Sequence, residues 1–574
     1  MEEITKLIKT AVKAEFNIDV EPVIIIPESE HGDFSTNIAM QIAKQVGKSP
    51  MEIAEIVTNH ITIQPSNHIT AVAVKPGYIN ISVPAKQLYD DLNSQWSEKY
   101  GENNDGDGQT VLVEYPSPNI AKPYSVGHLR PGNQGWAARN LMLATGWNVI
   151  TDNHIGDFGA PFGIWVVGFE KFSSEEQLSQ GGVYELGRIY TAMKEELAEE
   201  EKRGEKDLAQ ECQDWLLKLE HGNESATKYH EKFNKISLQH MHDVMKRLGI
   251  FTDFEIPESF YVERGKAEVV KLLKNGIAVQ NEDSSVIVNL EHFGIKTPIL
   301  LQKSNGAALY ATTDCATLLY RQERWSPDRV IYAVAVEQKF YFEQLFALAQ
   351  LLNINTELIH MWFGLIDQIY EDGKREKMSS RRGTILMEEL LDKAEAIARQ
   401  NAKSDDMSDE DIRKISLGAI KFTDFSKDRR TNILFDWDSM FSLTGFSGPY
   451  VQYAAVRINK ILKDNGRHPV HSSESENVAG SRNYDFESEK EIIKKLLEYP
   501  ETIRQSANNL EPHRVAQFVY DLARVMNRYY ENTPIATEEV EEDIKQTRLG
   551  LLEKVSQVFT HGLNILGIEI PERM

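Results

Sequence analysis

The sequence predicts a multidomain α/β plus all-α protein, in which a Rossmann-type parallel sheet with a helical insertion lies between a small α/β domain and a helical bundle. Its 574 residues are too many for one hydrophobic core. An apolar run at 111–115, a helical segment ending near Gly146 and a second apolar run at 147–151 form a βαβ pattern. From about residue 385 onward, apolar side chains keep helical spacing.

The order of these patterns predicts four domains. The first is a small α/β module that ends in the polar stretch 101–108, which has nothing to bury. The second is the sheet domain, whose insertion is dense in Glu and Lys and keeps helical periodicity. The predicted boundaries are 1–107, 108–390 with the insertion at about 165–250, a helical connector at 391–445, and a helical bundle at 446–574.

Two further apolar runs predict the second half of the sheet. Residues 329–335 resemble a strand, and Phe342, Leu345 and Ala349 mark an amphipathic helix after it. We also expect residues 360–365 to form a strand that leads toward a basic loop. A nucleotide-binding fold whose halves are separated by an insertion accounts for this order.

Composition narrows the class of protein without giving a function. The apolar fraction of 41% and the charged fraction of 26% are ordinary for a globular protein. Cys212 and Cys315 lie far apart without a nearby Cys/His cluster, which argues against a disulfide framework or a Cys-rich zinc site and fits a reducing cytosol. The N-terminus lacks the apolar core of a signal peptide, and no apolar run is long enough to span a bilayer. We therefore expect a cytoplasmic protein without a membrane partner.

The net charge of −24 opposes nucleic-acid binding at long range, because a nucleic acid is itself a polyanion. Binding would then depend on local basic groups, and two occur, at 374–382 and 427–430. Charge alone favours the simpler interpretation that these are solvated surface charges. Composition does not reveal a nucleic-acid-binding protein.

Residues 117–128, Ser-Pro-Asn-Ile-Ala-Lys-Pro-Tyr-Ser-Val-Gly-His, join the first apolar run to a helix. A tight turn before a helix N-terminus directs backbone N–H groups and the positive end of the helix dipole at an anion. Gly127 lets a ligand pack against the turn, and His128 can donate a hydrogen bond. A bare Gly-His pair would more often be an ordinary strand-to-helix turn, so its neighbours decide the interpretation.

A second motif, Lys377-Met378-Ser379-Ser380-Arg381, lies far downstream. By itself it would be a basic surface turn. In this order, each beside an apolar run, the two motifs resemble the nucleotide-binding signatures of class I aminoacyl-tRNA synthetases. The extended match from Glu114 to Arg130 narrows the resemblance to the arginyl-tRNA synthetase family.

The resemblance implies an ATP site built from both motifs. Amino-acid activation expels pyrophosphate without a protein nucleophile, so the site must supply positioning and charge stabilisation. Ser125 stands where the family usually has the first histidine of His-x-Gly-His, and Ser380 stands where a second lysine is usual. The resemblance implies that a lysine just upstream of the His-x-Gly-His segment substitutes for the latter, and Lys122 has that place. The implied residues are Lys122, Ser125, Gly127, His128, Lys377, Met378, Ser379, Ser380 and Arg381.

A guanidinium substrate requires carboxylates with polar neighbours. The resemblance implies that the arginine site contains Glu114, Asn119, His154, Tyr310, Asp314 and Gln338. Glu114 and Asp314 are the candidates for the guanidinium and the α-amino group. Taken singly, each residue would be a surface or helix-capping polar group. Their joint match to one family favours the site.

The resemblance extends to two tRNA-contacting regions. Residues 32–39 and 76–80 resemble the N-terminal domain that contacts the D-loop, so Tyr78 would stack on a base and Asn80 would hydrogen-bond it. A tyrosine in the core of a strand explains Tyr78 equally well. Residues 448–457 resemble the start of the anticodon-binding domain, with Tyr450, Tyr453 and Arg457 on one helical face. These side chains suit splayed bases, and equally suit packing of the helix on its neighbour.

Together these features predict an arginine-tRNA ligase. It would form arginyl-adenylate from L-arginine and ATP, with Mg²⁺ accompanying ATP and no structural metal, and pass arginine to the 3′-terminal adenosine of tRNA-Arg. A monomer is expected, because the family is mostly monomeric. The alternatives are another class I synthetase, a nucleotidyltransferase with the same turn, and a catalytically weak tRNA-binding paralogue that only Ser125 favours.

Overall fold

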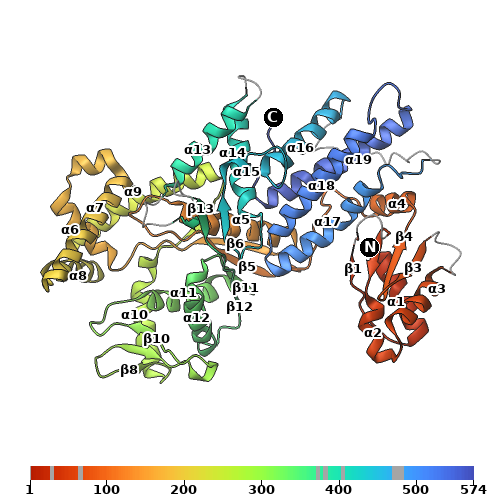
Figure 1. Cartoon of the computed structure of the whole chain (residues 1–574). Helices are drawn as coiled ribbons and strands as arrows, with labels where there is room; N and C mark the ends of the chain where they lie inside the picture. The colour runs from red at the N-terminus through yellow and green to blue at the C-terminus, as the bar shows by residue number, and fades with distance from the viewer. Residues whose placement is uncertain are drawn as a thin grey trace. The chain divides into compact units, whose positions relative to one another are not determined.

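The computed structural model describes residues 2–25, 27, 32–62, 69–369, 375–378, 385–402, 407–467 and 484–574. The chain divides into two compact units (Figure 1). Unit 1 comprises residues 1–101, 457–502 and 518–559, and unit 2 comprises residues 102–456, 503–517 and 560–574. Within the described ranges, no helix combines the length and apolarity needed to cross a membrane.

Unit 2 is built on a five-stranded parallel sheet with the strand order β12-β11-β5-β6-β7. Its strands are β5 (Thr110–Glu114), β6 (Asn148–Asn153), β7 (Phe254–Glu255), β11 (Arg329–Tyr332) and β12 (Glu357–His360). Helix α5 (Leu129–Ala144) connects β5 to β6, and α12 (Lys339–Leu351) connects β11 to β12. Val111, Leu112 and Val113 are fully buried, which explains their continuous apolar run. The predicted interrupted nucleotide-binding fold is confirmed.

The strand expected at 360–365 is wrong in its position. β12 ends at His360, and the Met361 N–H donates to the Tyr332 carbonyl as the chain leaves the sheet. Gly364 then lies against the backbone of Thr431, and a Cβ atom there would be 2.7 Å from the Thr431 carbonyl carbon. The apolar run continues because Met361 and Phe363 are buried in this connection.

The connection leads into a second, three-stranded sheet with the order β14-β13-β15. Its strands are β13 (Ile366–Ile369), β14 (Arg375–Lys377) and β15 (Ile433–Phe435), and the nearby helices are α13 (Met387–Asn401), α14 (Asp409–Asp424) and α15 (Trp437–Met440). Strand β13 pairs antiparallel with β14 and parallel with β15.

Four helices between β6 and β7 form the insertion, and they gather in one group (Figure 1). They are α6 (Pro161–Phe172), α7 (Glu175–Arg203), α8 (Asp207–Glu220) and α9 (Glu224–Leu248). Helix α9 begins where Asn223 accepts hydrogen bonds from the next backbone N–H groups, and ends at Gly249 with φ +64°. A small core of Ile164, Val167, Met193 and Cys212 holds α6, α7 and α8 together.

The stretch between β7 and β11 covers one side of the parallel sheet. It contains α10 (Glu258–Lys274), β8 (Val279–Gln280), β9 (Val286–Val288), β10 (Ile299–Gln302) and α11 (Tyr310–Trp325). Leu112, Val330 and Leu345 share a continuous buried core with these elements. The stretch therefore positions the residues at the N-termini of α10 and α11 close to the sheet.

Unit 1 contains a four-stranded antiparallel sheet with the order β1-β2-β4-β3. Its elements are α1 (Glu2–Phe16), β1 (Ile24–Ile25), β2 (Phe34–Thr36), α2 (Ile38–Val46), α3 (Pro50–Thr62), β3 (Thr70–Val74), β4 (Tyr78–Ser82) and α4 (Ala85–Gln95). The bundle helices, of which residues 457–502 and 518–559 belong to unit 1, are α16 (Gly448–Asp464), α17 (Lys490–Asn509), α18 (His513–Asn532) and α19 (Glu542–Ile565). Asp33 forms ion pairs with Lys490 and Lys494 of α17, which joins the small sheet to the bundle.

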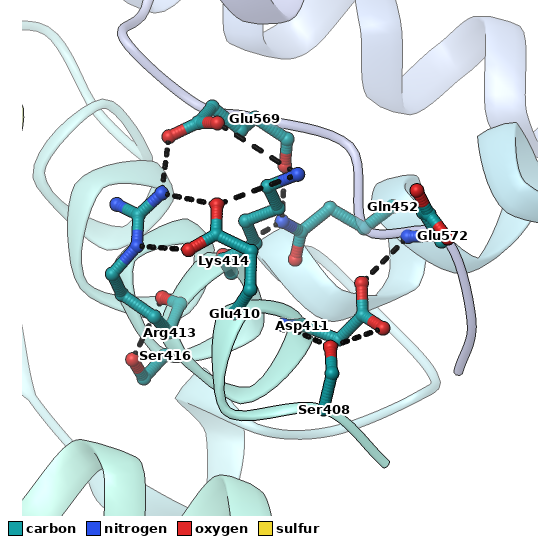
Figure 2. A network of polar contacts seen from close by, with 9 residues as sticks. All are labelled: Ser408, Glu410, Asp411, Arg413, Lys414, Ser416, Gln452, Glu569 and Glu572. Atoms are coloured by element: carbon teal, nitrogen blue, oxygen red, sulfur yellow. Dashed lines mark hydrogen bonds and ion pairs between the residues drawn. The ribbon is translucent and has the colours of Figure 1, made fainter.

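The C-terminal segment of unit 2 is bound by α14 (Figure 2). Arg413 and Lys414 form ion pairs with Glu569, and the Glu572 N–H donates to Asp411 over 2.7 Å. The Lys421 ammonium donates to the Gly567 carbonyl over 2.7 Å. Helix α14 thus contacts the last residues of the chain along its length.

Candidate active site

The carboxyl ends of β5, β6 and β11 border a cavity of about 430 Å³ in unit 2. Open sheets of this kind bind ligands at the carboxyl edge of their strands. The cavity is lined by Glu114, Pro116, Ser117, Asn119, Gly127, His128, Pro131, His154, Gly156, Glu258, Tyr310, Asp314, Tyr332, Ala333, Val334, Ala335, Gln338, Tyr341, Phe342, Leu345 and Phe363. All six residues predicted to bind arginine are among them, together with Gly127 and His128 of the first motif.

Asn119 is held at the cavity by its close contact with Gly156. The Ile120 N–H donates to the Gly156 carbonyl, and the Gly156 N–H donates to the Pro118 carbonyl. A Cβ atom on Gly156 would lie 2.1 Å from Oδ1 of Asn119. Glycine is therefore required here by the close approach of a side chain.

His128 is a neutral hydrogen-bond donor at the start of α5. Its Nδ1 accepts a hydrogen bond of 3.2 Å from the Ser125 N–H, so the proton of the neutral ring resides on Nε2. Burial lowers the pKa of His128 to about 4, which keeps the ring uncharged at neutral pH. Ser125 Oγ lies 3.5 Å from the same Nδ1. Ser125 therefore contacts the histidine of the first motif without lining the cavity.

Lys122 lies away from the cavity. Its ammonium group is 4.5 Å from the centre of the Tyr190 ring, in the insertion. Lys122 and His128 both line a smaller pocket on the other side of the first motif, against α9. A role for Lys122 at a bound triphosphate would require its side chain to leave Tyr190.

The second motif begins at the end of β14. The Met378 N–H donates to the Ile366 carbonyl over 2.8 Å, and Met378 does not line the cavity. Only the backbone of Lys377 is described, and Ser379, Ser380 and Arg381 lie outside the described residues. After the motif, the Met387 N–H donates to the Tyr124 carbonyl, and the Val126 N–H donates to the Ile385 carbonyl. The chain that follows the second motif is thus bonded directly to the first.

A buried arginine links two acidic strand ends behind the cavity. Arg321 of α11 contacts Glu114 Oε2 at 2.6 Å and Asp152 Oδ2 at 2.7 Å. Both charges keep the pKa of Arg321 well above its ordinary value despite its burial. Glu114 thereby has one oxygen committed to Arg321, while its other oxygen lies 3.4 Å from Ser117 Oγ. The fixed carboxylate can still accept a hydrogen bond from a ligand.

Two further carboxyl groups face the cavity in conditions that disfavour their charged forms. Burial, reinforced by the Glu114 charge, raises the pKa of Asp314 to about 7, although Tyr341 donates a hydrogen bond to it. Burial and the charges of Asp314, Asp157 and Glu114 raise the pKa of Glu258 to about 9. His154, whose Nε2 is 3.8 Å from Asp314, has its pKa lowered to about 4 by burial and by Arg321. A bound cation would relieve this concentration of acidic groups.

Sequence reasoning missed Arg321, Glu258 and Tyr341. Arg321 follows Tyr310 and Asp314 at helical spacing on α11, so a search along that helix face would have found it. Glu258 begins α10 and belongs to no motif, and Tyr341 lies within an aromatic-rich helix that resembles ordinary core. No local signal identified these two residues.

The residues predicted to contact tRNA lie in β4 and α16. Tyr78 and Asn80 are half-buried and share one face of β4, whereas Ile79 and Ile81 form its core face. Asn80 Oδ1 is 2.7 Å from Ser35 Oγ. Tyr450, Tyr453 and Arg457 lie in α16, and the Arg457 guanidinium is 3.2 Å from the centre of the Tyr530 ring.

Three family models match consecutive parts of the chain. The class I tRNA synthetase (R) catalytic domain matches residues 92–437, which include both motifs and the cavity. The arginyl tRNA synthetase N-terminal domain matches residues 2–83, and the DALR anticodon binding domain matches residues 451–574. The first of these covers more than half of the chain.

Full-length relatives agree with the family models. The chain is 35% identical over 567 residues to an arginine–tRNA ligase of Streptococcus thermophilus, which covers 97% of this chain and 96% of the relative. It is 33% identical over 574 residues to the corresponding Streptococcus pneumoniae protein, with 97% of both chains covered. Its fold resembles Thermus thermophilus arginyl-tRNA synthetase (TM-score 0.79, 22% identity, 100% of both chains) and the Plasmodium falciparum enzyme (TM-score 0.77, 21% identity, 100% of this chain and 99% of the other). The chain belongs to the arginyl-tRNA synthetase family, within the class I aminoacyl-tRNA synthetases.

Proposed function

We propose that the cavity bordered by β5, β6 and β11 activates L-arginine with ATP, and that the enzyme then passes arginine to the 3′-terminal adenosine of tRNA-Arg. The observation that carries the proposal is the excess of acidic groups at the cavity. Glu114, Glu258 and Asp314 line it, and Arg321, a buried cation behind it, is already paired with Glu114 and Asp152. A guanidinium is the natural counter-ion for this arrangement, because it stays charged and forms bidentate bonds with carboxylates.

Within this cavity, the two carboxyl groups with raised pKa are the proposed guanidinium ligands. Asp314 and Glu258 lie at the N-termini of neighbouring helices, away from the first motif in the sequence. The proposed partners of the substrate's α-amino and carboxylate groups are Glu114, which Arg321 fixes, Asn119 and Gln338. This orientation would direct the substrate carboxylate toward Gly127 and His128.

The first motif is the proposed site of the ATP phosphates. Gly127 and His128 line the cavity just before the N-terminus of α5, where the helix dipole is positive, and the neutral His128 offers its Nε2 proton. The reaction needs the substrate carboxylate in line with the α-phosphate, and it needs the charge of the departing pyrophosphate stabilised. Lys377 to Arg381 are proposed to supply that stabilisation, with Lys122 as a further candidate cation.

Mg²⁺ is proposed to accompany ATP on its phosphates. Among the described residues, no group of three or more His, Cys, Asp and Glu side chains could hold a metal ion. Mg²⁺ commonly binds through substrate phosphates and water, with few protein ligands. The residues present therefore fit an ion carried by the nucleotide.

tRNA is proposed to bind at residues of both units. Tyr78 and Asn80 share the non-core face of β4, which suits contact with a D-loop base, and Tyr450, Tyr453 and Arg457 are the proposed anticodon contacts. The corresponding domains are proposed at 1–107, 108–390, 391–445 and 446–574. We also propose that the enzyme acts as a monomer in the cytoplasm, where its three substrates occur together.

The test is arginine-dependent exchange of pyrophosphate into ATP, with and without cognate tRNA. We expect exchange with arginine and none with lysine or citrulline, since lysine lacks the planar fork and citrulline lacks the charge. Exchange supported equally by citrulline would contradict the acidic recognition site. Absence of exchange under all conditions, with tRNA still bound, would support the catalytically weak paralogue.

A further inference from the structure

Three side chains from the first turns of α5 converge on one buried carboxylate of α14. Arg130 Nε lies 2.9 Å from Asp424 Oδ1, Gln134 Nε2 lies 3.0 Å from the same oxygen, and Asn133 Nδ2 lies 3.1 Å from Oδ2. All four side chains are at most 2% exposed. The helix that follows His128 is thus fixed by a charge-assisted network shielded from water.

The Arg130 guanidinium also holds the chain that leads to the second motif. One terminal nitrogen donates to the Gly364 carbonyl over 2.7 Å and to the Thr431 carbonyl over 3.0 Å. Gly364 lies just before β13, and Thr431 lies just before β15, which pairs with β13. The guanidinium carbon is 5.6 Å from the centre of the Phe363 ring, and Phe363 lines the cavity.

The chain after the second motif is held by the first motif as well. The backbone hydrogen bonds between Val126 and Ile385 and between Tyr124 and Met387 are 3.1 Å and 2.9 Å long. The chain is therefore bonded to residues 124–130 both at Gly364, before the second motif, and at residues 385–387, after it. Of the attachments named here, those of Arg130 depend on a side chain.

We propose that Arg130 is a positioning residue that sets the spacing between the first motif and the sheet of β13, β14 and β15, from which the chain continues into the second motif. The inference deepens the proposed function, on which it rests. A planar guanidinium fixes three acceptors at once, whereas a lysine ammonium at that position is a point charge without the rigid fork. Displacement of reacting groups by about 1 Å can reduce an enzymatic rate by about 100-fold.

The test is Arg130→Lys in the full-length enzyme, assayed by ATP–pyrophosphate exchange with cognate tRNA. We expect kcat to fall by about 10- to 100-fold and KM for ATP to rise, while KM for arginine changes by less than about twofold. The matched control is Asp411→Asn, on the same helix as Asp424 but at its other end, against the C-terminal segment. The control should lower Tm and leave both KM values and kcat unchanged.

Arg130→Lys with a lowered Tm but wild-type kcat and ATP KM would overturn the positioning role. If that variant does not fold, Asn133→Ala replaces it, because it loosens Asp424 without removing a charge and should shift ATP KM in the same direction. An Asn133→Ala enzyme with unchanged kinetics would then overturn the inference. Failure of the wild-type enzyme to catalyse exchange would instead overturn the proposed function, and the inference with it.

Discussion

Arginine binding should be coupled to the ionisation of Asp314. The pKa of this buried carboxyl is raised to about 7, so below pH 7 it is mostly protonated and carries no charge for the guanidinium. The substrate guanidinium stays charged throughout the accessible range. Arginine affinity should therefore be strong above pH 7 and weaken as the pH falls below it. Glu258, with a pKa of about 9, stays mostly protonated at pH 8 and below, and His128 and His154, with pKa values of about 4, do not titrate in that range.

The magnitude follows from the fraction of Asp314 that is ionised. A group with a pKa of about 7 is about 90% ionised at pH 8 and about 10% ionised at pH 6. The dissociation constant for arginine should thus rise about tenfold between these pH values. Asp314→Asn removes the charge itself and should cost about 2 kcal/mol, or about 30-fold, at pH 8. At pH 6 the same variant should be only about threefold weaker than wild type.

Isothermal titration calorimetry with arginine at pH 6, 7 and 8 measures these constants directly. Repeating the titration in two buffers of different ionisation enthalpy counts the protons released on binding. Tyr341→Phe is the matched control, because it removes the hydrogen bond that lowers the pKa of Asp314 and should move the transition to higher pH without abolishing it. A wild-type affinity that is constant from pH 6 to pH 8, or an Asp314→Asn variant with the same transition, would refute the assignment.

Three other predictions concern the cavity and the first motif. Gly156→Ala should displace Asn119 and raise the KM for arginine by about fivefold or more, with little change in the KM for ATP. Exchange kinetics at varied concentrations of arginine and of ATP measure the two constants. His128→Ala should lower kcat by about 10²–10³-fold, and a variant without this side chain that keeps the wild-type kcat would contradict its role. The wild-type kcat should not show a histidine ionisation between pH 5.5 and 8, because the pKa of His128 is about 4. Ser125→His should change the exchange rate only modestly, because the Ser125 backbone N–H already fixes Nδ1 of His128; a rise from almost no activity would instead support the weak paralogue.

Much of the cavity could be predicted because parallel strands bring distant residues to one edge. Glu114, Asp314 and Gln338 are far apart in the sequence, yet the register of β5 with β11 and the packing of α11 place them around one space. Their recognition depended on motifs that a known family shares. Glu258 has no such motif, and its position results from the path of the chain between β7 and α10. Its contribution depends on burial, which a sequence does not record.

Charge and hydropathy patterns misled where packing decides the outcome. Arg429, counted among the surface basic groups, is 8% exposed and donates to the backbone carbonyls of Leu510 and Trp362. Arg430 is committed to Asp428 and Glu511. The apolar run at 360–365 marks burial correctly, but it does not reveal that the regular strand pairing with β11 ends at His360. Apolar character predicts that a segment is buried, but it does not predict which strand its backbone pairs with.

The attachment of the C-terminal segment to α14 makes the end of this chain part of the catalytic unit. Lys421 is 1% exposed, burial lowers its pKa to about 7, and its ammonium donates to the Gly567 carbonyl. Loss of that carbonyl would leave a buried cation short of an acceptor, so removal of residues 567–574 would act on the enzyme like a core mutation. An affinity tag or fusion partner placed after Met574 would begin beside α14, whose last residue, Asp424, is bonded to α5.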